Sequence, residues 1–137
     1  MPALPDRLEE ARVWLSYARA NLAHAAAGRA ADVLAEYLCF DAQQAAEKAL
    51  KAALIVHNVR PPRVHDLGEL LRLLSDAHVN VPADVQRAED LSAFAVQARY
   101  PGWGDRVEDE DVSNATATAE AVIVWVAELI ELGSPPE

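Results

Sequence analysis

Apolar residues recur every third or fourth position through most of this 137-residue sequence, and helix-breaking residues divide the pattern into five stretches. That spacing places apolar side chains on one face of an α-helix, whereas a strand alternates every second residue. The pattern therefore predicts an all-α fold: an antiparallel up-and-down bundle of four long helices plus one short helix. The expected helices cover about 5–28, 32–58, 66–77, 83–99 and 109–133.

Several residues indicate where these helices start and stop. Gly28 is expected to cap the end of the first helix, and the pair Pro61-Pro62 stops the second. Asp66 and Glu69 have the spacing of a capping box at the start of the short third helix, with Asp as the capping residue.

The second helix has an apolar stripe that consists mostly of alanine. Such small side chains let a neighbouring helix approach closely, and the amount of apolar face leads us to expect a homodimer. We expect the whole chain, residues 1–137, to form a single domain. The stripe consists of Leu34, Leu38, Ala42, Ala45, Ala49, Ala52 and Val56.

The cysteine content and the hydropathy indicate a cytoplasmic protein. Cys39 is the single cysteine, so no internal disulfide can form, and its apolar surroundings predict a core residue. The first ten residues lack the pattern of a signal peptide, and no apolar run approaches the roughly 20 residues that span a bilayer. We therefore expect no membrane association.

The net charge of −10 argues against broad binding to long nucleic acids, which usually requires a basic excess. The charge is unevenly distributed, however. Residues 43–72 hold five Lys and Arg against three Asp and Glu, while acidic residues gather in 108–111 and in the last helix. The sequence thus permits a local basic site on an acidic protein.

The segment CFDAQQAAEKALKAALIVHNVRPPRVHDLGELLRLL, from Cys39 to Leu74, resembles the signature of the HEPN family (higher eukaryotes and prokaryotes nucleotide-binding domain). The later run from Ala98 to Pro101 resembles the Arg-Tyr-Pro near the last inter-helix loop of that family. Trp14 lies where members often carry an aromatic residue. The resemblance implies a bundle of four to five helices, usually a dimer, so that residues 1–137 would form one HEPN domain.

The resemblance also implies two kinds of function. Prokaryotic members are often encoded beside a minimal nucleotidyltransferase, in a two-component, toxin–antitoxin-like module. Many members are metal-independent ribonucleases that use an Arg, four to six residues and then a His, a spacing that Arg60 and His65 meet. His65 would take a proton from a ribose 2′-hydroxyl, while Arg60 or Arg63 stabilises charge on the phosphate.

Two hypotheses follow. In the first, which we favour, the chain is a binding subunit for a nucleotide or RNA and for a nucleotidyltransferase partner. In the second it is a ribonuclease toxin that uses Arg60 and His65. In the family this motif usually lies at a later helix, and Pro61-Pro62 interrupts it here, so these two departures favour the first hypothesis. The candidate ligand contacts are Lys48, Lys51, Arg60, Arg63, His65 and Arg99.

Each candidate also has a structural interpretation. Lys48 and Lys51 would lie on a solvated face beside Glu47, Arg99 would fix its loop, and Gln43 and Gln44 would bridge helices through their amides. His57 and His65 lack a partnering carboxylate motif, so we predict neither a metal site nor a cofactor.

Overall fold

The computed structural model describes residues 2–27, 34–97, 100 and 106–133. Every regular element in these residues is helical and none is a strand, which confirms the predicted all-α fold. The helical segments are α1 (Leu4–Ala26), α2 (Ala35–Val56), α3 (Leu67–Asp76), α4 (Ala83–Gln86), the 3₁₀ helix η1 (Arg87–Ala93), α5 (Phe94–Gln97) and α6 (Asp109–Gly133).

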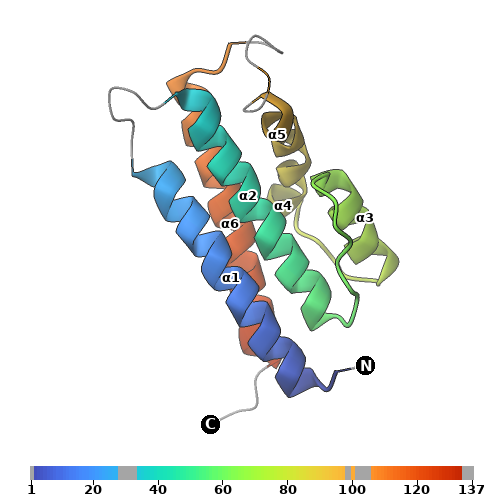
Figure 1. The fold of residues 1–137 in the computed structure, drawn as a ribbon. Helices are drawn as coiled ribbons and strands as arrows, with labels where there is room; N and C mark the ends of the chain where they lie inside the picture. Colours follow the sequence, from blue (N-terminus) through green and yellow to red (C-terminus); the bar gives the residue numbers. More distant parts are fainter. Residues whose placement is uncertain (1, 28–33, 98–99, 101–105, 134–137) are drawn as a thin grey trace.

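The three long helices α1, α2 and α6 pack against one another, α3, η1 and α5 pack on the other side of α2, and α4 packs against α6 and η1 (Figure 1). In the view of Figure 1 the chain runs up through α1, down through α2, up through α4, η1 and α5, and down through α6. The structure is therefore an up-and-down bundle in which α3 is an additional helix beside α2.

The helix α2 is the centre of the bundle and is buried almost all round. It contacts α1 and α6 on one side and α3, η1 and α5 on the other. A helix that is enclosed in this way needs small side chains wherever a neighbour comes close. Its alanines supply them, and those that are fully buried are Ala42, Ala45, Ala46, Ala49, Ala52 and Ala53.

Two helices end in a left-handed residue rather than at a proline. Asn58, with φ 62°, follows α2, and His78, also with φ 62°, follows α3. The next amide in each case, that of Val59 or Val79, donates to a helix carbonyl five residues earlier, at 2.9 and 3.0 Å. This is the hydrogen bond of a Schellman motif. The helix α2 therefore ends before Pro61-Pro62, although the prolines were predicted to stop it.

The expected fourth helix, 83–99, is not continuous. It consists of α4, η1 and α5, with a 3₁₀ helix in the middle. A 3₁₀ helix has three residues per turn, so apolar residues spaced by three lie on one face. Val85, Ala88, Leu91 and Phe94 have this spacing, and the first three are buried. The core thus favours the tighter helix here, and the prediction of one long α-helix was wrong.

Smaller differences concern the other helix ends. The helix α1 begins at Leu4 rather than at Pro5-Asp6, and the expected cap Gly28 lies outside the described residues. Asp66 caps α3 as predicted, because its side chain accepts a hydrogen bond from the Gly68 amide. Glu69 does not complete the capping box and instead pairs with Arg72.

None of the helices in the described segments combines the length and apolarity that crossing a membrane requires.

Cys39 provides a test of the packing, because burial, with smaller contributions from Asp111 and Glu36, raises the pKa of its thiol from 9.0 to about 12. The thiolate is the reactive form, and three pKa units reduce its population about a thousandfold at pH 8. We therefore expect alkylation in native buffer to be slower than in 6 M guanidinium by roughly this factor or more. Labelling at the rate of a free thiol would contradict the packing of α2.

Candidate functional site

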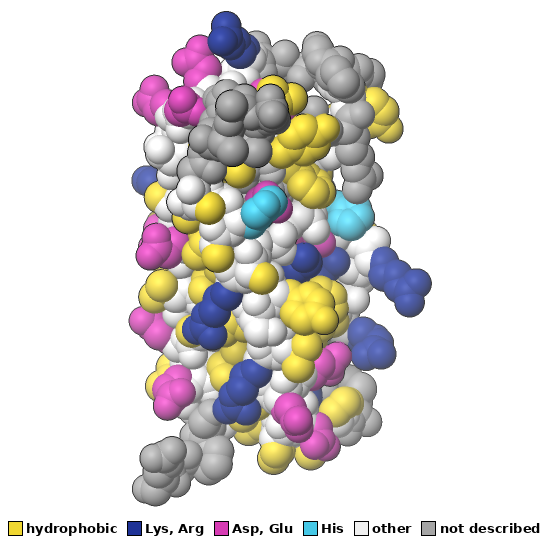
Figure 2. All heavy atoms as spheres, turned by 60° about the vertical axis from the view of Figure 1, so that its left-hand side comes forward, with side chains coloured by type: hydrophobic (Ala, Val, Ile, Leu, Met, Phe, Trp, Pro, Cys, Tyr) yellow, Lys and Arg dark blue, Asp and Glu magenta, His cyan; other side chains and the backbone are white. Residues whose placement is uncertain are grey.

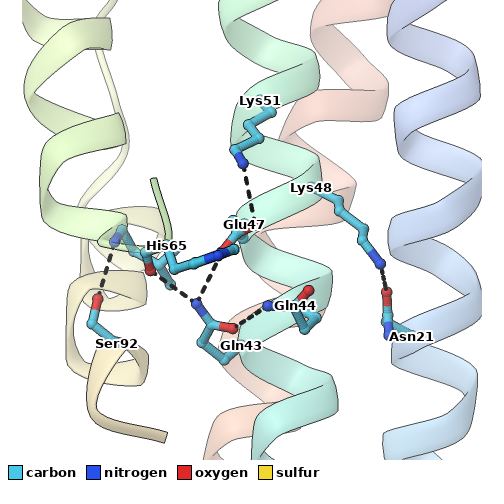
Figure 3. A network of polar contacts seen from close by, with 9 residues as sticks. Asn21, Gln43, Gln44, Glu47, Lys48, Lys51, His65 and Ser92 are labelled. Carbon is cyan, nitrogen blue, oxygen red and sulfur yellow. Dashed lines mark hydrogen bonds and ion pairs between the residues drawn. The ribbon is translucent and has the colours of Figure 1, made fainter. Parts of the chain in front are cut away.

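The most unusual polar group in the bundle is the carboxylate of Glu47, on the side of α2 that faces the loop before α3. The residue is only 3% exposed, in a helix otherwise packed with alanine and leucine. A buried carboxylate is stable only when donors surround it. Three donors do so here, from Gln43, Lys51 and His65 (Figure 3).

The geometry gives each oxygen of this carboxylate a partner. Oε1 lies 2.9 Å from Nδ1 of His65 and accepts from Nε2 of Gln43 at 3.3 Å. Oε2 accepts from Nζ of Lys51 at 3.2 Å. An ionised carboxylate only accepts, so the Glu47 contact assigns a hydrogen to Nδ1 of His65. The other ring nitrogen, Nε2, is then free for a ligand, and the His65 side chain is 57% exposed.

Gln43, on α2, fixes the position of the His65 backbone. It is fully buried, and its Nε2 also donates to the backbone carbonyl of His65 at 3.1 Å. Its Oε1 accepts from Nε2 of Gln44 at 2.7 Å. Gln43 and Gln44 were predicted to bridge helices; instead, Gln43 connects α2 to the loop that carries His65, and Gln44 bonds to Gln43 within α2.

The first two backbone amides of α3 already have partners within the protein. The Leu67 amide donates to Oγ of Ser92 at 3.0 Å, and the Gly68 amide donates to Oδ1 of Asp66 at 2.9 Å. A phosphate at His65 would therefore be bound through side chains rather than through these two N–H groups. Ser92, from η1, fixes α3 beside the site, and no local pattern in the sequence indicates this contact.

The two lysines are held within the bundle, so they do not form the solvated face predicted from the sequence. Lys51 is 7% exposed, and its ammonium lies 5.8 Å from the centroid of the Trp14 ring in addition to its bond with Glu47. Lys48 is partly buried, and its Nζ donates to Oδ1 of Asn21 on α1 at 2.6 Å. Lys51 therefore neutralises Glu47, and Lys48 joins α2 to α1.

The predicted arginines lie in different places. Arg63 is exposed in the loop two residues before His65. Arg60 is also exposed, but it lines a small hollow with Ile55 and with Arg7 of α1. Because Ile55 and Glu47 are eight residues apart on α2, this hollow lies about 12 Å along the helix from the carboxylate that holds His65. Arg99 lies outside the described residues.

The structure therefore brings together Glu47, Lys51 and His65, and it leaves Arg63 exposed nearby in the same loop. Within the described part of the chain, neither Arg60 nor Arg63 forms an ion pair. Figure 2 shows one face of the molecule on which Lys, Arg and His side chains lie around an apolar patch, with acidic side chains along the left edge and at the lower right. Of the five basic residues in 43–72, Lys51 and Arg72 form ion pairs with carboxylates, so the remaining positive charge of this segment is that of Lys48, Arg60 and Arg63.

The remaining candidate side chains have internal roles. His57 contacts the Ala53 carbonyl through Nδ1, at 2.8 Å, and His24 pairs with Asp41. Cys39 is a core residue, as predicted. Among the described residues, no group of three His, Cys, Asp or Glu side chains has an arrangement that could hold a metal ion.

Comparison with known proteins gives two positive findings. A sequence model of the HEPN domain matches residues 11–129. The crystal structure of TT1696 from Thermus thermophilus is similar over 87% of this chain and 97% of that one, with a TM-score of 0.72 and 31% sequence identity. No curated protein sequence matches the chain significantly.

The buried network predicts a large loss of stability when its carboxylate is removed. In Glu47→Ala, the buried Lys51 loses its counter-charge, which we expect to lower the free energy of unfolding by about 3–5 kcal/mol. Lys51→Met should cost less, because Glu47 keeps its His65 and Gln43 donors. Chemical denaturation followed by circular dichroism measures both changes.

The matched control is Glu69→Ala, which removes another paired glutamate from a helix, but from an exposed pair with Arg72. Exposed pairs contribute little, so the denaturation midpoint should hardly move. Equal midpoints for Glu47→Ala and Glu69→Ala would show that the network does not support the bundle.

Proposed function

This chain belongs to the HEPN domain family, and from that membership we propose that it is the binding subunit of a two-component module. In this proposal it binds a phosphate-bearing nucleotide or RNA end at His65, and a minimal nucleotidyltransferase is its protein partner. The module would be of the toxin–antitoxin-like kind that the family resemblance implies.

The observation that carries the proposal is the exposed imidazole of His65 on the buried carboxylate of Glu47. The contact at 2.9 Å fixes the ring and directs the free Nε2 to the outside. In the imidazolium form, this ring donates from both nitrogens. With the guanidinium of Arg63 in the same loop, the site can provide charge-assisted hydrogen bonds to a phosphate.

The distribution of charge restricts the size of the ligand. A long nucleic acid contacts many phosphates and gains affinity from each cation that it meets. Here the exposed cations of the His65 loop are few, and the whole chain has a net charge of −10. A mononucleotide or the end of an RNA strand needs only one or two phosphate contacts and fits this arrangement better.

A homodimer stays part of the proposal. Both α1 and α2 expose large apolar or aromatic side chains, which a second subunit could cover. These are Val13 and Tyr17 on α1, Leu34 at the start of α2, and Tyr37 on α2, each more than half exposed.

The second candidate function is a metal-independent ribonuclease that uses Arg60 and His65. The observation in its favour is the Glu47–His65 contact, because a hydrogen on Nδ1 leaves Nε2 as the proton acceptor that a general base requires. Arg60 lines a different hollow of the same chain. A composite site would therefore need the Arg60 of a second subunit.

A binding experiment tests the first proposal. The probe is a labelled RNA trinucleotide with a 5′-phosphate, compared with the same RNA ending in a 5′-hydroxyl, in fluorescence-anisotropy titrations. We expect tighter binding of the phosphorylated RNA, and roughly tenfold weaker binding after His65→Ala or Arg63→Ala, because each removes a charge-assisted hydrogen bond.

The matched control is Arg87→Ala, which removes an exposed arginine from η1. Equal affinity for both RNAs, or an equal loss in all three variants, would contradict the proposed site. Incubating the samples with longer RNA in excess EDTA tests the second function. Cleavage that disappears in both Arg60→Ala and His65→Ala would establish the ribonuclease.

A further inference from the structure

The helix α6 has two apolar faces, and only one of them is covered by the bundle. The covered face packs against α1 and α2. On the second face, Ala117, Ala121 and Val124 recur at the same three-to-four spacing in the middle of the helix, between Ser113 and Glu128. The buried residues of the covered face are Ala115, Ala119, Val122, Ile123, Val126 and Ile130.

The second face lines a long furrow, which we call the α6 furrow. It consists of two shallow, open hollows of about 510 and 500 Å³, which are neighbours because Ala117 and Glu120 border both of them. The ends of α1 and α2 border the first hollow, and the start of α4 borders the second. On α6 the furrow extends from Asp109 to Glu128, which is about 28 Å, or five helical turns.

The floor of the furrow suits a helix. Ala117 and Ala121 lie in the middle, where their small side chains let a helical backbone approach closely. Val124 is 52% exposed although it is apolar, and the partly buried Trp125 lies next to it. A helix with apolar residues every third or fourth position would cover these side chains, as in other helix-in-groove complexes.

The rim of the furrow determines the charge of that helix. Asp84, Glu120 and Glu128 border the second hollow, and none of them forms an ion pair within the described residues. Residues 109–133 hold six acidic residues and no Lys or Arg. If a second copy of this chain bound here through its own α6, related by a two-fold axis, acidic residues would face acidic residues. Their repulsion disfavours a second copy as the binding partner of the furrow.

We propose that the α6 furrow is the docking site for a basic amphipathic helix of a partner protein. The apolar face of the partner helix lies on Ala117, Ala121 and Val124, and its Lys and Arg residues pair with the acidic rim. This deepens the partner half of the proposed function and rests on it only for the expectation that a protein partner exists. It does not depend on RNA binding at His65.

The probe is a 20-residue helical peptide with an Ala and Leu face flanked by Lys and Arg, titrated calorimetrically into the full chain. A charge-inverted peptide carries Glu in place of each Lys and Arg. We expect one-to-one binding of the basic peptide and at least tenfold weaker binding after Ala121→Arg, which blocks the floor. The double variant Glu120→Lys/Glu128→Lys should lose the basic peptide and bind the inverted one.

The matched control is Glu110→Lys/Glu131→Lys, which makes the same change of net charge on exposed residues of α6 that do not line the furrow. It should change the affinity less than threefold. An equal loss in the control and rim variants, or no one-to-one binding by the unaltered chain, would overturn the proposal. The RNA trinucleotide, titrated into the same variants, reports on the His65 site separately, so a failure of either proposal can be assigned.

Discussion

The structure depends on a charged pair, Glu47 and Lys51, inside the most buried helix of the bundle. The alanines of α2 bring α1, α3 and α6 close on all sides, so this pair has little access to water. Ions in such a place must find all their partners within the protein. Lys51 has Glu47 and the Trp14 ring, and Glu47 also has Gln43 and His65. The need to satisfy a buried carboxylate thus sets the position of an exposed histidine.

Much of the fold was predictable, because apolar periodicity reports directly on which faces are buried. The extents of α2, α3 and α6 differ from the predicted ones by no more than three residues at either end. The error at η1 has an identifiable cause, since residues 85, 88, 91 and 94 have a period of three that was interpreted as that of an α-helix. The left-handed residues Asn58 and His78 at the ends of α2 and α3 were missed, because helix ends were predicted from the positions of prolines and glycines.

The site was less predictable, because its contacts join distant parts of the chain. His65 and the α3 cap Asp66 were recognised from local spacing, and Lys51 from its distance of four to Glu47. Nothing local connects His65 to Glu47, 18 residues earlier, or Ser92 to the Leu67 amide, 25 residues earlier. Lys51 is an internal counter-ion rather than a surface group because other helices surround α2. The sequence of α2 alone does not show that burial.

The separation of charge within the fold makes the proposed anion site compatible with an acidic protein. The helix α6 contains acidic residues but no Lys or Arg. The segment 43–72, in contrast, contains five Lys and Arg and three Asp and Glu, an excess of two positive charges. Electrostatic interactions weaken beyond roughly 8–10 Å at physiological salt, so a phosphate at His65 senses mainly its own loop. A longer polyanion extends beyond that distance and meets the acidic remainder of the surface. The net charge therefore restricts the length of the ligand, while the local charge determines whether an anion binds at all.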